Sequence, residues 1–114
     1  LRRRGENVSA WEVERIVARH PSVEECALVG VDSGLGAGDD DLKLFVKLKP
    51  QKILEPLDLI RWCEDKMPYF QIPRYVDFTR EFPKTPSQRI RKAELSRSTN
   101  DCWDIQGTGY TFKR

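Results

Sequence analysis

Two neighbouring apolar patterns constrain the fold of this chain more than any other feature. Residues 26–31 form a short, unbroken apolar run, which is typical of a strand buried on both faces. After a connection rich in glycine and aspartate, residues 42–49 alternate between aliphatic side chains and mostly lysines. This alternation predicts a half-buried strand that pairs with the first one as a hairpin.

Two amphipathic segments accompany this hairpin. Ser9–Glu12 has the sequence of a capping box, and the apolar side chains after it repeat with helical spacing until Pro21. Pro56 opens a second helix, apolar on one face, which ends at Pro68. A weaker strand is expected at residues 75–78. The order helix, strand, strand, helix, strand predicts an α+β fold, a small three-stranded sheet with packed helices.

Length and composition narrow the class of protein. The 114 residues suit one domain, and 39% hydrophobic with 33% charged residues is a globular balance. No apolar run reaches the roughly 18 residues that a membrane helix needs. Three widely spaced cysteines without a C-x-x-C pair indicate reduced thiols, so we expect a cytoplasmic protein. Because Leu1 is not Met and three arginines follow it, we expect a piece of a longer chain.

Three features that resemble ligand sites have simpler interpretations. The glycines of residues 34–38 precede an acidic triplet and a strand, not a helix, which favours a flexible hairpin loop over a phosphate loop. The triplet at residues 39–41 lacks the spaced ligands of a calcium loop. His20 has no second histidine for zinc and no suitably spaced nucleophile, so we interpret it as a partly buried or capping residue, and we expect no metal site.

The charges are unevenly distributed along the chain. The formal net charge is only +2, but residues 74–97 carry seven basic and three acidic side chains. Within this stretch, prolines at positions 83 and 86 stiffen a basic loop, which can hold a cation toward an anion at low entropic cost. This segment is therefore a candidate anion-facing surface.

Four segments, in this order and spacing, resemble the C-terminal lid domain of the adenylate-forming superfamily, which includes acyl- and aryl-CoA ligases, luciferases and peptide-synthetase adenylation domains. They are GENVSAWEVE at residues 5–14, HPSVEECALVG at 20–30, FQIPR at 70–74 and FPKTPSQRIRK at 82–92. The resemblance covers residues 1–95, so we expect the lid domain there and a C-terminal extension at residues 96–114.

The resemblance implies a two-step ligase. A carboxylate attacks ATP to give an acyl-adenylate and pyrophosphate, and coenzyme A then displaces AMP to give a thioester. ATP, Mg²⁺ and coenzyme A serve the full-length enzyme, whose large N-terminal adenylation domain holds most of the acyl and ATP sites. The isolated lid is expected to be inactive and to bind none of them tightly. The arginine-rich opening and Trp11 resemble the branch with crotonobetaine/carnitine-CoA ligases, which implies substrates of that type.

The family's catalytic lysine is replaced in this chain. Its position is occupied by Arg89, and the glycine before it by Gln88. Arginine keeps the positive charge but is bulkier and planar, and the two residues are not interchangeable at a tight site. We expect Arg89 to serve adenylation by stabilising charge at the forming carboxylate–phosphate bond, with Lys84 and Lys92 as candidate substitutes.

The resemblance also implies residues on the coenzyme A side. Gly5 corresponds to the glycine that lines the pantetheine tunnel, where a side chain would obstruct the channel, and Glu6 follows it. Phe70 and Arg74 match positions that face coenzyme A, with Arg74 toward its phosphates. Ile72 stands where some relatives carry another basic residue.

Two readings from other classes remain open. A catalytically degenerate lid, retained for interaction or regulation, is favoured by the replacement of lysine with Arg89. A nucleic-acid module would use the basic segment 74–97, but no RNA- or DNA-binding motif accompanies it, and we expect no nucleic-acid partner.

Overall fold

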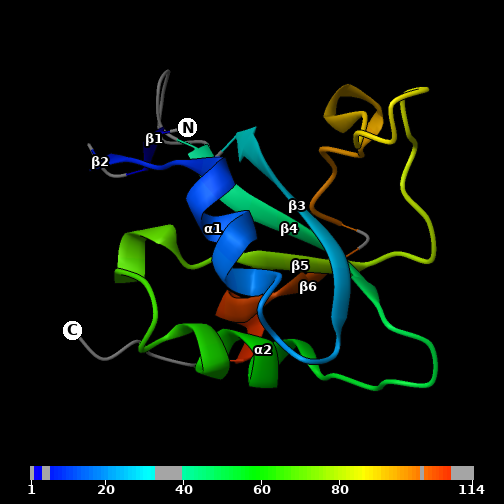
Figure 1. The fold of residues 1–114 in the computed structure, drawn as a ribbon. Helices are drawn as coiled ribbons and strands as arrows, with labels where there is room; N and C mark the ends of the chain where they lie inside the picture. Colours follow the sequence, from blue (N-terminus) through cyan, green and yellow to red (C-terminus); the bar gives the residue numbers. More distant parts are fainter. Residues whose placement is uncertain (1, 4–5, 33–39, 101, 109–114) are drawn as a thin grey trace.

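The computed structural model describes residues 2–3, 6–32, 40–100 and 102–108. Gly5 and the glycine-rich connection at residues 34–38 lie outside this set. In chain order the elements (Figure 1) are β1 (Arg2–Arg3), β2 (Glu6–Asn7), α1 (Ala10–Val17), β3 (Val23–Asp32), β4 (Asp40–Leu48), α2 (Pro56–Cys63), η1 (Tyr69–Gln71), β5 (Tyr75–Phe78), η2 (Lys92–Glu94), β6 (Trp103–Asp104) and η3 (Ile105–Thr108).

The main sheet has the strand order β3-β4-β5-β6. Strands β3 and β4 pair antiparallel, which confirms the predicted hairpin. Strand β5 is parallel to β4, and α2 lies in the connection because parallel neighbours need a crossover. The α+β class is confirmed, and β5 has the predicted bounds. The sheet has one strand more than expected, because β6 is only two residues long and comes from a polar stretch without a strand pattern.

Helix α1 begins where the capping box predicts. The Ser9 side chain accepts a hydrogen bond from the Glu12 amide at 3.3 Å. The helix ends at Val17, earlier than expected, because a proline disfavours the helical conformation of the residue before it. Ahead of Pro21 the chain tightens, and the His20 amide donates to the Val17 carbonyl at 3.0 Å.

Helix α2 begins at Pro56 as predicted and ends at Cys63, five residues before Pro68. Leu59 and Ile60 are fully buried. Beyond the helix, tighter turns continue the chain, since the Lys66 amide donates to the Cys63 carbonyl at 2.9 Å.

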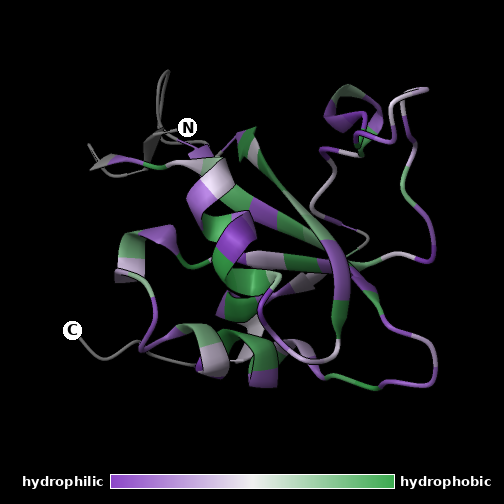
Figure 2. Ribbon diagram, viewed as in Figure 1, coloured by the Kyte–Doolittle hydropathy of each residue, from purple (hydrophilic) through white to green (hydrophobic). Residues whose placement is uncertain are grey.

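Both helices pack on one face of the sheet and form the main core with it. Figure 2 shows hydrophobic residues gathered on β3 and β4 and on parts of both helices. Fully buried aliphatic side chains of this size each contribute about 1.5–3 kcal/mol. The fully or almost fully buried members from α1, β3, β4, α2 and β5 are Val13, Val17, Val23, Leu28, Leu42, Leu44, Val46, Leu59, Ile60 and Val76.

The second face of the sheet is covered by residues 79–98, which we call the strap. It leaves the end of β5, crosses to one side of the molecule and returns toward β6 (Figure 1, yellow to orange). Phe82 and Leu95 of the strap pack against Ala27, Val29 and Phe45 in a second, smaller core. The strap lacks a periodic apolar pattern, so the sequence gives no sign of this layer.

The prediction that β4 is only half-buried is wrong, because the strap also buries the second face of this strand. Lys43 has no exposed surface, and Phe45 is 5% exposed. Alternation with lysine normally marks a solvent face. Here the amino group of Lys43 is hydrogen-bonded to the strap instead.

Candidate functional site

The predicted catalytic position lies on a tight turn within the strap. Lys84 and Ile90 form an isolated antiparallel bridge, and the chain reverses between them. The Thr85 amide donates to the Arg89 carbonyl at 2.8 Å, and the Arg89 amide donates to the Thr85 hydroxyl at 3.1 Å. The Gln88 amide closes the turn on the Thr85 carbonyl at 2.9 Å. Residues 85–89, which we call the Arg89 turn, are therefore held by their own hydrogen bonds.

The backbone of the Arg89 turn explains why a glycine suits position 88. Gln88 has a φ of 68°, in the left-handed region that side chains with a Cβ adopt at a cost. Glycine adopts this conformation without that cost. The turn therefore keeps the backbone shape that a glycine would favour, although Gln88 stands there.

The Arg89 side chain is exposed and available for a ligand. Among the described residues, no hydrogen bond or ion pair engages the guanidinium of Arg89 or of Arg80. The other five basic side chains of residues 74–97 are engaged within the chain, and they are Arg74, Lys84, Arg91, Lys92 and Arg97. The predicted anion-facing surface is thus largely neutralised by intramolecular partners, and Arg89 is one of two exceptions.

The two candidate substitutes for Arg89 both hold ion pairs. The Lys84 amino group lies 2.7 Å from the Glu25 carboxylate, on β3. The Lys92 amino group lies 2.6 Å from the Glu14 carboxylate, which also accepts the Leu28 amide at 2.7 Å. These pairs tie the strap to β3 and α1, so a catalytic use of either lysine would break a contact that holds the strap.

Arg74 lies directly before β5 and contacts side chains of β4 and β6. Its guanidinium donates to both oxygens of Asp104 on β6, at 3.0 Å each, and to Asp41 on β4 at 2.9 Å. The group also stacks over the ring of Tyr75, 4.7 Å from its centroid. Hydrogen bonds from Arg74 hold the pKa of the Asp104 carboxyl below its usual value, and hydrogen bonding to Asp104 raises the pKa of Arg74.

These contacts leave Arg74 few N–H groups that it can donate to a phosphate. Three of its five N–H groups are donated to carboxylates, and its side chain is 20% exposed. Asp41 and Asp104 together carry more negative charge than the guanidinium carries positive charge. Contact between Arg74 and coenzyme A stays a prediction, and it requires Asp41 and Asp104 to release the guanidinium.

The structure describes two of the other residues predicted on the coenzyme A side, Phe70 and Glu6. Phe70 lies in η1, is half-buried and packs against the main core, edge-on to Tyr69 at 5.9 Å between ring centroids. Glu6 lies in β2, which pairs with β1. Gly5 is outside the described residues. In Figure 1, η1 (yellow-green) and the strap (yellow to orange) lie toward opposite sides of the view.

His20 is a structural residue, as the sequence indicates. Its Nδ1 accepts the Ser22 amide at 3.0 Å, and its ring meets Trp62 edge-on at 5.0 Å. Burial, and then the charge of Lys66, lower the pKa of His20, which favours the neutral ring that accepts this hydrogen bond.

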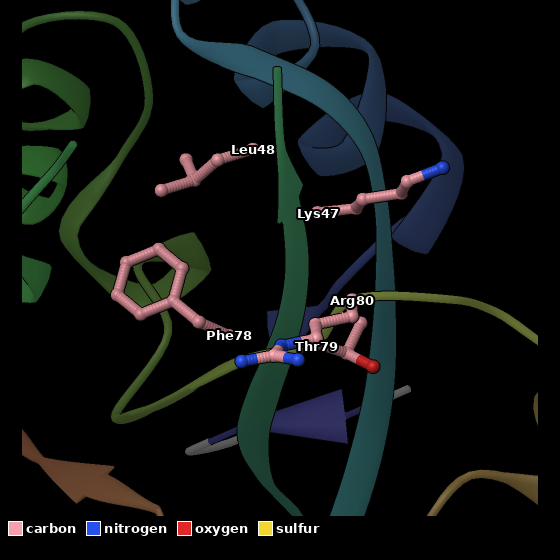
Figure 3. A pocket seen from close by; sticks show the side chains of 5 residues that line it. All are labelled: Lys47, Leu48, Phe78, Thr79 and Arg80. Carbon is pink, nitrogen blue, oxygen red and sulfur yellow. The ribbon is translucent and has the colours of Figure 1, made fainter. Parts of the chain in front are cut away.

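A hollow that sequence reasoning missed lies at the carboxyl ends of β4 and β5. It measures about 390 Å³ and is lined by Lys47, Leu48, Phe78, Thr79 and Arg80. In Figure 3 the Phe78 ring and Leu48 lie on the same side of β4, while Lys47 points away from them. The Lys47 amino group lies 2.7 Å from Glu24. In the sequence, the feature that indicates this hollow is Phe78 with Arg80, an aromatic residue and a cation directly at the end of a strand.

Neither a membrane span nor a metal cluster is found in the part of the chain that the structure describes. No helix there is both long and apolar enough to cross a bilayer. No three His, Cys, Asp or Glu side chains gather there into a possible ion site.

The fold matches solved adenylate-forming enzymes. It is similar to part of the anthranilate CoA ligase AuaEII, solved with anthranoyl-AMP, with a TM-score of 0.73 and 32% identity over 82% of this chain and 18% of that one. It is also similar to the amide bond synthetase McbA from Marinactinospora thermotolerans, with a TM-score of 0.72 and 27% identity over 79% and 18% of the two chains.

The sequence comparisons agree with the fold. The family model of the AMP-binding enzyme C-terminal domain matches residues 12–89, and the chain therefore belongs to this family. Over 95 residues it is 33% identical to crotonobetaine/carnitine–CoA ligase of Escherichia coli. That match covers 83% of this chain but only 18% of the ligase. The predicted resemblance is confirmed.

Proposed function

We propose that this chain is the lid of an ATP-dependent acyl-CoA ligase whose larger N-terminal adenylation domain lies elsewhere in the same polypeptide. Family membership supports the class of enzyme, and the 18% coverage of the Escherichia coli ligase fits a lid-sized part of it. In this proposal the larger domain binds the carboxylate substrate and ATP, and the lid supplies groups for each step. The three cysteines are not joined by disulfides, which suits a cytoplasmic location, and that location remains a prediction.

The observation that carries the proposal is the Arg89 turn. It presents an exposed guanidinium, without a partner among the described residues, on a backbone closed by its own hydrogen bonds. In adenylation a carboxylate oxygen forms a bond to the α-phosphorus of ATP, and the bond from that phosphorus to pyrophosphate breaks. Negative charge on the phosphoryl oxygens needs a positioned cation, and Arg89 is the residue that we assign to it.

The chemistry of arginine bears on the alternative of a degenerate lid. A guanidinium remains charged at any physiological pH and can donate two parallel hydrogen bonds to phosphoryl or carboxylate oxygens. Arg89 can therefore replace the charge of a lysine, although it needs more space. Adenylation by the natural sequence would rule out the degenerate lid.

In the second step the thiol of coenzyme A attacks the acyl carbonyl, and AMP leaves with the electrons of the carbon–oxygen bond. Gly5, Glu6, Phe70 and Arg74 are proposed on this side. Gly5→Leu is expected to block thioester formation and spare adenylation. If Arg74 contacts coenzyme A phosphates, Asp104→Asn should lower the KM for coenzyme A, because it removes a competing carboxylate. An unchanged KM in both Asp104→Asn and Arg74→Ala would remove Arg74 from the site.

ATP and Mg²⁺ are assigned to the complete enzyme. Mg²⁺ would neutralise phosphate charge in adenylation, which is its general role in phosphoryl transfer. The described residues contain no acidic cluster that fits a metal ion, so we assign no Mg²⁺ ligand among them.

The acyl substrate is proposed from relatives alone. The Escherichia coli ligase acts on crotonobetaine and carnitine by name, and the anthranilate CoA ligase acts on an aryl acid. We propose a carnitine-type or other small carboxylate. Similarity to an amide bond synthetase favours a second candidate, in which an amine takes the place of coenzyme A as acceptor.

The test is AMP formation by the complete polypeptide with ATP, Mg²⁺ and a panel of carboxylates that includes carnitine, crotonobetaine and anthranilate. Each acid is offered with coenzyme A, with an amine, and with no acceptor. AMP and acyl-CoA appearing together would support the ligase, and an amide product would favour the second candidate. A folded polypeptide that binds ATP but releases no AMP across the panel would contradict both.

A further inference from the structure

Lys43 is a charged residue that the sheet and strap bury completely. Its side chain has 0% exposed surface, at the centre of β4 and on the face covered by the strap. Burying an ammonium group is costly unless charged or polar partners replace its water. The groups that contact the Lys43 amino group therefore indicate which parts of the fold this buried charge holds together.

Two of these partners lie on the returning end of the strap. The Lys43 amino group donates to the carbonyl of Ser96 at 3.1 Å and to that of Ser98 at 2.6 Å. The Asp77 carboxylate on β5 lies 3.6 Å away and balances the charge, and the Phe45 ring lies 4.7 Å from the amino group. A single side chain thus joins two central strands to a segment more than 50 residues further along the chain.

The other charged contacts of the strap are more exposed. Lys84 and Glu25 are 26% and 28% exposed, and Lys92 and Glu14 are 39% and 19% exposed. Water screens such pairs and lets them rearrange. The Lys43 side chain itself is fully buried, although its partner Asp77 is 24% exposed. A buried polar group of this kind can fix one arrangement of a segment without adding much to overall stability.

We propose that Lys43 is a positioning residue for Arg89. Its ammonium fixes the returning end of the strap on the sheet, and the strap's packing carries that constraint to the Arg89 turn. The link runs through Leu95 and Phe82, which share one small core, and through the Arg91 amide, which donates to the Pro83 carbonyl at 2.8 Å. This role rests on the proposed function of Arg89 in adenylation.

The expected consequence is a selective loss of one half-reaction. Displacing a reacting group by about 1 Å can cost roughly 100-fold in rate. In the complete polypeptide, Lys43→Met keeps the length and apolar stem of the side chain and removes the charge. We expect it to slow ATP–pyrophosphate exchange by roughly 10- to 100-fold, while thioester formation from supplied acyl-adenylate stays within about twofold of the unaltered enzyme.

Hydrogen exchange gives a readout that does not depend on activity. The amides of Arg91, Glu94 and Leu95 donate within the strap and report its order. In Lys43→Met they should exchange faster, while the amides of α1 and α2 keep their protection. Lys49→Met, the same substitution at an exposed residue just after β4, should change neither the exchange nor either half-reaction.

The outcomes separate the two proposals. If the unaltered polypeptide performs both half-reactions and Lys43→Met lowers both equally, or neither, the positioning role is wrong and the proposed function stands. If the unaltered polypeptide performs neither, the proposed function fails and the positioning role fails with it. Should Lys43→Met not fold, Lys43→Arg keeps the buried charge in a bulkier shape. It must then slow the same half-reaction selectively, and an equal effect on both would overturn the proposal.

Discussion

The contact between Arg74 and Asp104 allows the most quantitative prediction about this fold. It joins the short strand β6 to β5 through two hydrogen bonds of 3.0 Å, and a third bond of 2.9 Å reaches Asp41. A hydrogen bond to a charged partner contributes about 1.5–3 kcal/mol. Removing one partner of a fully buried pair costs about 3–5 kcal/mol. Because Arg74 and Asp104 are 20% and 32% exposed, solvent recovers part of that cost.

Arg74→Met is therefore expected to lower the free energy of unfolding by about 2–4 kcal/mol. Asp104→Asn, which leaves the second carboxylate in place, should cost about 1–2 kcal/mol. Urea unfolding followed by circular dichroism measures both, and the double variant should show a coupling of at least about 1 kcal/mol. Asp65→Asn is the matched control, because its pair with Lys66 is 82% exposed on the acidic side and should contribute less than about 0.5 kcal/mol.

The same contact predicts a pH dependence. The pKa of Asp104 is lowered in the folded state, so its stabilising contribution is present above the ordinary value of 3.8 and is lost as pH falls through the folded pKa. Asp104→Asn should remove this component below about pH 4. An Arg74→Met variant as stable as the Asp65→Asn control, with no coupling to Asp104, would refute the view that this pair holds β6 on the sheet.

Three further predictions concern other parts of the chain. Gln88 has a φ of 68°, which a glycine adopts without steric cost, so Gln88→Gly should raise the free energy of unfolding in urea by about 1 kcal/mol. Gln88→Ala keeps a Cβ and should not raise it. Equal values for the two variants would show that this backbone conformation stores no strain. The pKa of His20 is lowered in the folded state, so its contribution to stability is full above pH 6.5 and declines as pH falls below it. His20→Asn should flatten this decline in the free energy of unfolding. The same pH profile in His20→Asn and in the unaltered chain would contradict this prediction. Burial raises the pKa of the Cys26 and Cys63 thiols to about 12, so iodoacetamide at pH 8 should modify them only after unfolding, and rapid modification of the native chain would refute this.

Periodicity was sufficient to predict the main elements of the fold. The capping box located the start of α1, and the proline at position 56 located the start of α2. The apolar run and the alternating run identified β3 and β4 as a hairpin. These signals work because a helix or strand repeats its contacts at a fixed spacing, which a linear sequence displays directly.

The second face of the sheet could not be predicted in this way. The strap contacts β3 and β4 through isolated residues such as Phe82 and Leu95, with no repeat to indicate them. Lys43 was therefore expected in solvent, and its role as a buried anchor depends on carbonyls more than 50 residues away. The same holds for β6, which has no strand pattern but pairs with β5 and carries Asp104, the partner of Arg74.

The candidate site was predicted through motif order, and the structure adds which cations are available. The sequence assigned seven basic residues to one surface, but five of them satisfy carboxylates or carbonyls of the chain itself. Such pairings depend on three-dimensional proximity and cannot be counted from composition. The motif already singled out Arg89, and the structure adds that Lys84 and Lys92 are held in ion pairs, whereas the Arg89 guanidinium has none among the described residues.

The most direct test of the central claim is ATP–pyrophosphate exchange by the complete polypeptide, compared between the natural sequence and Arg89→Ala. Removing one positioned charge from a phosphoryl-transfer site is expected to slow exchange by about 100- to 1,000-fold. Thioester formation from supplied acyl-adenylate should be retained, and Arg80→Ala should be silent in both assays. Exchange that continues unchanged in Arg89→Ala would contradict the assignment of Arg89 to adenylation.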